Sequence, residues 1–185
     1  MDVILRAAGP ADADALAALH NRVWQTAFAD LAPAEALQKL DLKSREAKWR
    51  RLLAEPAADQ LVLMAEDDGT LVGMAATGAS DDPAFGGRAE IHSVYVDLGQ
   101  QGRGIGETLL RGLARHLNAV GRDAAALDVV EGNDGAARLY QRLGAREIAR
   151  TIDAGPIWKS RNIIYAWDSL DPLLGGSARG EHPNK

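Results

Sequence analysis

The sequence predicts one domain of the mixed α/β class, in which helices flank a single mixed sheet. The chain has 185 residues, a length that suits one domain with a sizeable core. Apolar residues make up 46 % and charged residues 25 %, which is ordinary for a globular protein. Along the chain, short apolar segments alternate with longer segments whose apolar residues recur every three or four positions. These two patterns are typical of strands and helices.

The N-terminal third is predicted to contain one strand and three helices. In the first helix, Leu16, Leu19 and Val23 fall on one face, as expected for a helix packed on a core. Ser44 is a suitable N-cap for the third helix, which Pro56 ends. The four elements are expected over residues 3–7, 13–28, 33–40 and 44–53.

The middle of the chain predicts a β-hairpin followed by a polar loop. Residues 60–66 and 70–77 have the composition of strands, and residues 67–69 (Asp-Asp-Gly) form the tight turn between them. Residues 80–87 contain Pro and Gly among polar residues. We expect this loop to act as a mobile lid or rim.

The strongest signal is a strand followed by a glycine turn and a helix. Residues 91–96 predict a strand, and residues 105–120 carry one apolar stripe at helical spacing. Between them lie Gly102, Gly104 and Gly106. Unpaired amides at a helix N-terminus, together with the helix dipole, attract anions, and glycines let a bulky phosphate approach the backbone. The segment therefore predicts a site for a phosphate-containing ligand.

Two common phosphate-binding motifs do not fit this turn. A dinucleotide-binding turn needs glycines at relative positions one, three and six, but counting from Gly102 or Gly104 places Glu107 or Leu109 at the sixth position. A nucleotide-hydrolase loop needs Gly-Lys followed by Ser or Thr, and the chain contains no Gly-Lys pair. An ordinary tight turn without a ligand is the structural alternative.

The C-terminal part predicts a strand, a helix and a closing antiparallel pair. The helix begins at Asn133 or Asp134, and Gly144 is its C-terminal cap. The strands are expected over residues 124–130, 147–151 and 160–167.

Two linked motifs resemble the GCN5-related N-acetyltransferase (GNAT) superfamily. Gln101-x-x-Gly104-x-Gly106 resembles its acyl-CoA-binding motif. Residues 133–145 (NDGAARLYQRLGA) are similar to its Asn-x-x-Ala-x-x-Leu-Tyr-x-x-x-Gly-Phe block. The resemblance covers roughly residues 3–168 and implies the GNAT-like fold, a central, mostly antiparallel sheet flanked by helices.

The chain departs from the family pattern at two positions. Leu98 stands where many relatives carry Pro, which affects the stiffness of the loop more than its chemistry. Ala145 stands where Phe is usual, which indicates a local change in packing.

Composition and charge restrict the partners. The chain has no cysteine, which excludes a disulfide framework, a thiolate metal site and a cysteine nucleophile. A net charge of −5 argues against a nucleic-acid partner and is compatible with a cationic amine. The absence of a signal-like N-terminus or a membrane-length apolar run leads us to expect a cytoplasmic protein without a membrane partner. Residues 171–185 are expected to be a disordered tail after a domain over residues 1–170.

The resemblance implies acyl transfer from acetyl-CoA to a primary amine of a small molecule or peptide. Such an amine must lose a proton, and Glu90 occupies the position of the family's catalytic glutamate. By strand alternation, Glu90, His92, Val94 and Val96 would share one face, so His92 is a second base or a relay through water. The structural alternatives are a solvated Glu90 paired with Arg88 and a hydrogen-bonded, purely structural His92.

The leaving thiolate benefits from a proton, and the resemblance assigns this donor role to Tyr140. Its alternative is a packed tyrosine with a surface hydroxyl. Arg103 could add charge at the phosphates or simply be exposed, and Asn133 could contact the cofactor or only cap its helix. The residues that the resemblance places at the donor are Val94, Tyr95, Val96, Gln101, Gly102, Arg103, Gly104, Ile105, Gly106, Glu107, Asn133 and Ala136.

For the acceptor pocket, the resemblance points to residues 20–45, the loop over residues 80–88 and the loop near Trp158. Trp24 and Phe28 are its expected walls, with packing in the core as the alternative. Homodimers occur in the family, and no residue here decides the assembly. Two other functions stay open: a non-catalytic acyl-CoA-binding module on the same fold, and a nucleotide-binding module of another class.

Overall fold

The computed structural model describes residues 3–57, 59–155 and 158–175. The strands in these ranges are β1 (Ile4–Ala7), β2 (Leu61–Asp67), β3 (Thr70–Gly78), β4 (Ala89–Val96), β5 (Ala125–Val130), β6 (Arg146–Asp153) and β7 (Ser160–Trp167). They form one sheet in the order β1-β2-β3-β4-β5-β7-β6. All neighbours are antiparallel except β4 and β5, which confirms the predicted mixed, mostly antiparallel sheet.

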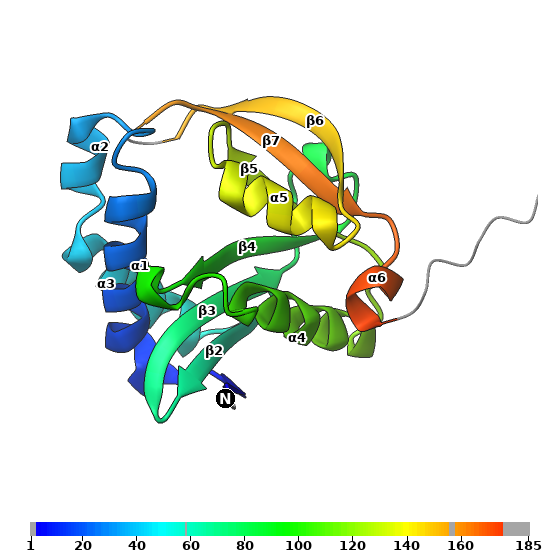
Figure 1. Ribbon diagram of the computed structural model, residues 1–185, viewed down its shortest axis with the longest axis horizontal. Helices are drawn as coiled ribbons and strands as arrows, with labels where there is room; N and C mark the ends of the chain where they lie inside the picture. The colour runs from blue at the N-terminus through cyan, green and yellow to red at the C-terminus, as the bar shows by residue number, and fades with distance from the viewer. Residues whose placement is uncertain (1–2, 58, 156–157, 176–185) are drawn as a thin grey trace, which may run out of the picture.

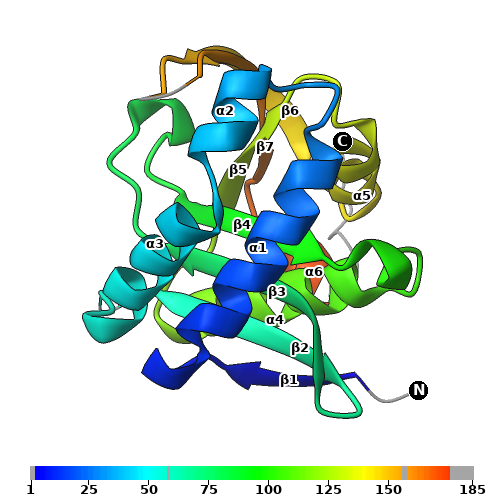
Figure 2. The same cartoon turned by 90° about the vertical axis from the view of Figure 1, so that its left-hand side faces the viewer.

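The helices lie close to their predicted positions. They are α1 (Ala13–Ala27), α2 (Ala34–Lys39), α3 (Leu42–Ala54), α4 (Ile105–Ala119), α5 (Asp134–Arg142) and α6 (Asp171–Leu174). Helix α4 covers one face of β2 to β4, while α1 and α3 cover the other face (Figures 1 and 2). Helix α5 packs against β5 and β7 (Figure 1).

Two apolar cores hold these layers together. Leu109, Leu113 and Leu117 of α4 are fully buried against the sheet, as the stripe at helical spacing predicted. Val120, at the end of that stripe, is the C-cap of α4 and is 41 % exposed. On the opposite face, the predicted apolar face of α1 packs with Trp49 of α3.

Two local predictions need correction. Asp41, and not Ser44, caps α3, because the helix begins at Leu42 and the Asp41 carboxylate accepts the Ser44 amide at 2.9 Å. A short helix, α6, occupies the start of the tail that was expected to be disordered. The loop over residues 80–87 stays a predicted lid or rim, and Phe85 within it is buried against Ala126, Ile164 and Ala166.

Helix α6 adds its own contact to the core. Leu173 is buried, and Arg111 of α4 donates to the Leu173 carbonyl oxygen at 2.8 Å. The helix therefore caps the C-terminal half of α4 (Figure 1). Residues 176–185 of the expected tail lie outside the described residues.

The sheet splits between β4 and β5. These strands pair only at Ala89 with Ala125 and Glu90 with Ala126. Beyond Glu90 they diverge, so the inner edges of both strands lack a neighbour from the sheet (Figure 1). Because the strands run parallel, the opening lies at their C-terminal ends, just before the glycine turn.

A β-bulge at His92 changes which residues of β4 share a face. On β3, Ala76 and Thr77 are consecutive, but their partners on β4 are Ser93 and Ile91. The extra residue, His92, shifts the alternation by one.

The bulge overturns the expectation that Glu90, His92, Val94 and Val96 share one face. Val94 and Val96 pack with Ile91 on the α4 side, whereas Tyr95 packs on the α1 side. The side chain of Glu90 therefore lies on the α1 face of β4, the face opposite α4.

Candidate functional site

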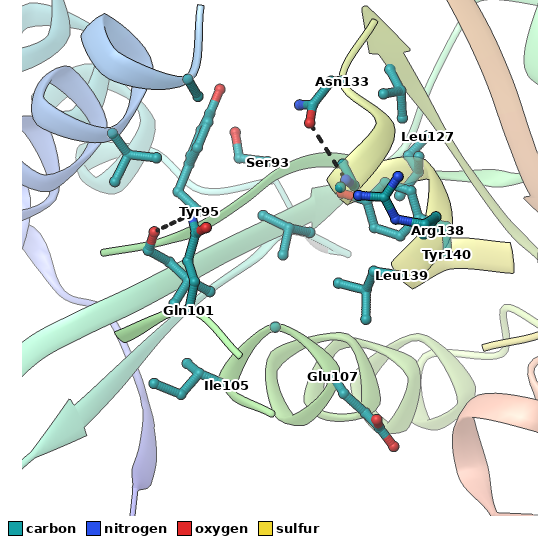
Figure 3. A pocket seen from close by; sticks show the side chains of 18 of the residues that line it. Ser93, Tyr95, Gln101, Ile105, Glu107, Leu127, Asn133, Arg138, Leu139 and Tyr140 are labelled. Carbon is teal, nitrogen blue, oxygen red and sulfur yellow. Dashed lines mark hydrogen bonds between the residues drawn. The ribbon is translucent and has the colours of Figure 1, made fainter. Parts of the chain in front are cut away.

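A cavity of about 790 Å³ occupies the opening between β4 and β5. Figure 3 shows Ser93 and Tyr95 on the β4 side of this cavity. Asn133 and Tyr140, at the beginning and end of α5, line the opposite side (Figure 3). The glycine turn and the first turn of α4, with Ile105, close the remaining side.

The glycine turn has the geometry of an anion cradle. Gly102 and Gly104 have φ angles of +78° and +79°, which side-chain-bearing residues rarely adopt. A Cβ atom at either position would meet nothing within 4 Å, so open space adjoins both backbones. Because a helix leaves its first amides unpaired, the start of α4 presents N–H donors to this space.

The predicted donor-binding residues line the cavity with one exception. The guanidinium of Arg103 turns away to Asp67, with a nitrogen–oxygen distance of 2.7 Å, and also donates to Gln100. Two arginines that the sequence reasoning did not single out, Arg138 and Arg142, line the cavity instead. Their spacing of four residues on one helix was the available signal, because it places both on one face of α5.

Tyr140 forms part of the cavity wall and is 6 % exposed. No residue in the described part of the chain forms a hydrogen bond with its hydroxyl. Burial, followed by the nearby Tyr95 and Asp128, raises the pKa of Tyr140 above its ordinary value. The hydroxyl therefore carries its proton at neutral pH.

Asn133 caps its helix and also lies at the cavity, where the cofactor contact was predicted. Its side-chain oxygen accepts the Ala136 amide at 3.4 Å and so caps α5. The same residue lines the cavity (Figure 3).

Glu90 does not line the main cavity but a neighbouring groove of about 310 Å³. Its Oε1 lies 3.0 Å from Nδ1 of His92, which lines the main cavity. Burial favours a higher pKa for Glu90, but hydrogen bonds from His92 and Ser80 outweigh it and hold the pKa below its usual value. The suggested pairing with Arg88 is wrong, because Arg88 pairs with Asp168 at 2.5 Å.

Asp128 borders both spaces, and the sequence reasoning did not single it out. Its side chain lines both the main cavity and the groove that contains Glu90. Desolvation by the surrounding protein raises the pKa of Asp128. A hydrogen bond from Asn162 lowers this pKa, and the negative charge of the nearby Glu90 raises it. The net pKa lies above the usual value, although the side chain remains open to water. No local motif marks Asp128, because its place depends on the split beside β4.

The aromatic residues predicted for the acceptor pocket form one cluster. The rings of Trp24 and Phe28 stack at a centroid distance of 5.3 Å. Trp158 meets both rings edge-on, at 6.4 Å and 6.2 Å. Phe28 lines the cavity, while Trp24 and Trp158 support it from behind.

Within the described ranges, no group of three or more His, Asp or Glu side chains is arranged to hold a metal ion. In the same part of the chain, no helix has the length and apolar character needed to cross a membrane.

Comparison with known proteins agrees with this geometry. The sequence profile of the acetyltransferase (GNAT) family matches residues 17–145, which include the glycine turn and α5. The chain belongs to the GNAT acetyltransferase family. The expected family resemblance is thereby confirmed, and the GNAT motifs occupy the cavity walls.

Two named acetyltransferases are similar in sequence to this chain. A mycothiol acetyltransferase from Thermomonospora curvata is 37 % identical over 124 residues, which is 66 % of this chain and 38 % of that protein. An L-methionine sulfoximine/L-methionine sulfone acetyltransferase from Pseudomonas paraeruginosa is 30 % identical over 152 residues, 78 % of this chain and 80 % of that protein. The chain spans about two fifths of the length of the mycothiol acetyltransferases that it matches.

Solved structures confirm the GNAT fold. A protein from Salmonella typhimurium, described as an acetyltransferase with its cofactor acetyl-CoA, superposes with a TM-score of 0.68. The alignment covers 98 % of this chain and 100 % of that protein at 22 % identity, so the likeness is one of fold.

Proposed function

We propose that this GNAT protein is an N-acetyltransferase that uses acetyl-CoA to acetylate a primary amine. The observation that carries the proposal is the split between β4 and β5, beside which lie an anion cradle, a protonated Tyr140 and two carboxylates, in two spaces that share Asp128 as a lining residue. The acetyl-CoA in the Salmonella structure supports the choice of donor.

The residues present fit the donor. The open space beside Gly102 and Gly104, with the amides of α4, suits a pyrophosphate. Arg138 and Arg142 bring positive charge to the same cavity for further phosphate groups. The free inner edge of β4 offers backbone hydrogen bonds to an extended arm that contains amides, with Val94 and Val96 in place for this.

The reaction needs two proton transfers, and Glu90 and Tyr140 are proposed to carry out one each. When bound, acetyl-CoA supplies the acetyl group as a thioester, and the amine nitrogen bonds to the carbonyl carbon as the carbon–sulfur bond breaks. Glu90 takes the proton that the amine loses, either directly or through His92. Tyr140 gives its hydroxyl proton to the departing sulfur and recovers it from solvent. The amide of Val96 is the donor to the carbonyl oxygen that gains negative charge.

The test is a thiol-release assay with acetyl-CoA and a broad panel of amines. We expect Tyr140→Phe and Glu90→Gln to lower kcat by at least about tenfold, because general acid–base groups contribute about 10²–10⁴-fold to rate. Calorimetry should show that both variants still bind acetyl-CoA. Unchanged rates would remove both assignments.

The competing function is a non-catalytic acyl-CoA-binding module on the same fold. It predicts that CoA binds while no amine in the panel releases free thiol. The protonated Tyr140 in the cavity wall favours the enzyme, because binding the donor alone does not need a proton donor at that place. The names of the two relatives refer to different acceptors, so these names do not identify the acceptor of this chain.

A further inference from the structure

Asp128 is a carboxylate at the narrow end of the split, and it takes part in none of the proton transfers proposed above. It lies on β5 two residues beyond Ala126, the last residue of β5 that pairs with β4. Its side chain is exposed and lines both the main cavity and the groove that contains Glu90. A molecule in either space therefore meets this carboxylate.

The direction of the proposed donor brings its reactive end toward Asp128. The glycine turn, which would hold the phosphates, lies beyond Val96 at the wide end of the split. From there the extended arm would follow β4 past Val96 and Val94, toward the last pair of the two strands. The thioester is at the end of that arm, so it arrives at the narrow end, where Asp128 lines the cavity.

Asp128 and Tyr140 approach this place from opposite faces of the sheet. Leu127 and Val129, the neighbours of Asp128 on β5, pack in the core that contains Tyr140. Because side chains alternate along a strand, Asp128 projects to the other face, where Ala126 packs with residues of the groove. The charge of Asp128 nevertheless contributes to the raised pKa of Tyr140. A carboxylate and a protonated hydroxyl thus flank one end of the cavity.

The transfers assigned to Glu90 and Tyr140 leave one proton of an ammonium acceptor without a base. An alkylammonium ion, with a pKa of about 10.4, first loses a proton to gain a lone pair. When the neutral nitrogen bonds to the thioester carbon it becomes positive, and it loses a second proton to end as an amide. The second proton leaves in the main cavity, which Glu90 reaches only through His92.

We propose that Asp128 is a second catalytic base, which takes the proton from the acceptor nitrogen as that nitrogen bonds to the thioester carbon. The inference rests on the proposed acetyltransferase function and adds one residue to its site. In this step the N–H bond breaks, its electron pair stays on nitrogen, and an Asp128 oxygen gains the proton. The carbon–sulfur bond breaks, and the sulfur leaves with the proton of Tyr140. Asp128 then releases its proton to solvent.

The surroundings of Asp128 suit a base. The charges that act on it come from Glu90 on β4 and Asp153 on β6, both negative, and no cation of the described residues is among them. Asn162 on β7 donates a hydrogen bond to it, and Tyr140 on α5 is uncharged. The net pKa lies above that of an ordinary aspartate, and a carboxylate with a higher pKa accepts a proton more readily.

Matched amines of high and low basicity separate the two proton losses. Thiol release is measured with ethylamine and trifluoroethylamine, and with phenethylamine and its analogue that carries two fluorines next to the amine-bearing carbon. The fluorinated amines are largely neutral at neutral pH, so they need only the second loss. Glu90→Gln should slow the ordinary amines at least about tenfold and the fluorinated ones less than about threefold, whereas Asp128→Asn should slow both at least about tenfold.

Asp153→Asn is the matched control. It removes the same charge from the groove, at a residue that does not line the main cavity. We expect kcat to stay within about twofold of wild type with all four amines. If Asp128→Asn turns over the fluorinated amines at the wild-type rate, or slows them no more than Asp153→Asn does, the assignment is wrong.

The pH dependence gives a readout that a purely structural role would not change. With the fluorinated amines, corrected for their own protonation, wild-type kcat/KM should fall as the pH drops through the raised pKa of Asp128. The fall is expected because a protonated carboxyl cannot accept the proton. Asp128→Asn should lack it, although Glu90 and His92 are present in both proteins. A wild-type profile without this fall overturns the proposal, even if the variant does not fold.

Turnover itself separates this inference from the proposed function. If no amine in the panel or in these pairs releases thiol, the acetyltransferase function fails and the role of Asp128 fails with it. If amines are turned over with the same rates and pH profiles in wild type and Asp128→Asn, the function stands and Asp128 alone is removed from the mechanism.

Discussion

His20 shows how one buried side chain ties stability to pH. The imidazole is 2 % exposed, and its Nδ1 accepts the indole N–H of Trp49 at 3.2 Å. Burial, with the positive charges of Arg45 and Lys48, lowers the pKa of His20 to about 2. The ring is therefore neutral in the folded protein throughout the physiological range, whereas the unfolded chain takes up a proton below its ordinary pKa of about 6.5.

This difference predicts a loss of stability in mild acid. Because the folded pKa is depressed, the unfolded state binds more protons between about pH 2 and 6.5, and stability falls as the pH drops through that window. From pH 7 to pH 5 the free energy of unfolding should fall by about 2 kcal/mol. Urea denaturation at both pH values measures it. His20→Gln should lose most of this dependence, and an undiminished slope in that variant would contradict the assignment.

The residues proposed for the chemistry differ in how clearly the sequence marks them. Tyr140 and the glycines stand in motifs and could be predicted. Asp128 could not, because an acid within a strand carries no local mark of function. Its place at the cavity arises only because β5 separates from β4 beyond Glu90.

At the scale of elements, the turn before α4 combines a left-handed backbone, which glycine adopts freely, with an open surface. Gly104 is the N-cap of α4 and has φ +79°, and open space adjoins it on the cavity side. Boundaries of this kind could be predicted to within one or two residues, because glycines and apolar spacing mark them. The bulge at His92 could not, because it depends on how two residues of β3 are matched to three of β4.

We expect Gly104→Ala to weaken CoA binding by tenfold or more, because a methyl group enters the space reserved for phosphates. The substitution should also cost about 1–2 kcal/mol of stability from the left-handed backbone. Gly121→Ala is the matched control, with φ +80° and equally open surroundings but a position beyond the other end of α4. Calorimetry should show the affinity loss in the first variant alone. Equal affinities would mean that the turn does not hold phosphate.

For the whole molecule, the sheet consists of two parts, here called wings. They are joined only where Ala89 and Glu90 of β4 pair with Ala125 and Ala126 of β5, a segment here called the seam. Strands β1 to β4 form one wing with α1, α3 and α4, and β5 to β7 form the other with α5 (Figures 1 and 2). The mixed sheet itself could be predicted from the order of elements. The seam could not, since nothing in β4 or β5 says where their pairing stops.

Donor binding should therefore rigidify the inner edges of both wings. Acetyl-CoA at 100 times its Kd adds about 2.7 kcal/mol to the free energy of unfolding. Hydrogen exchange should show new protection at residues 94–96 and 101–106. Adenosine 3′,5′-bisphosphate, which lacks the extended arm, should protect only residues 101–106. Equal protection by both ligands would show that the arm does not lie along β4.

The short seam also has a consequence for the protein without its donor. Inner strand edges with unused amides and carbonyls are templates on which a foreign strand can pair. In this fold the two edges face each other across the cavity, and the extended arm of the proposed donor would pair with the β4 edge. A cell starved of the thioester would then hold a population with two exposed templates, so the supply of a metabolite would govern how readily this protein aggregates as well as how fast it works.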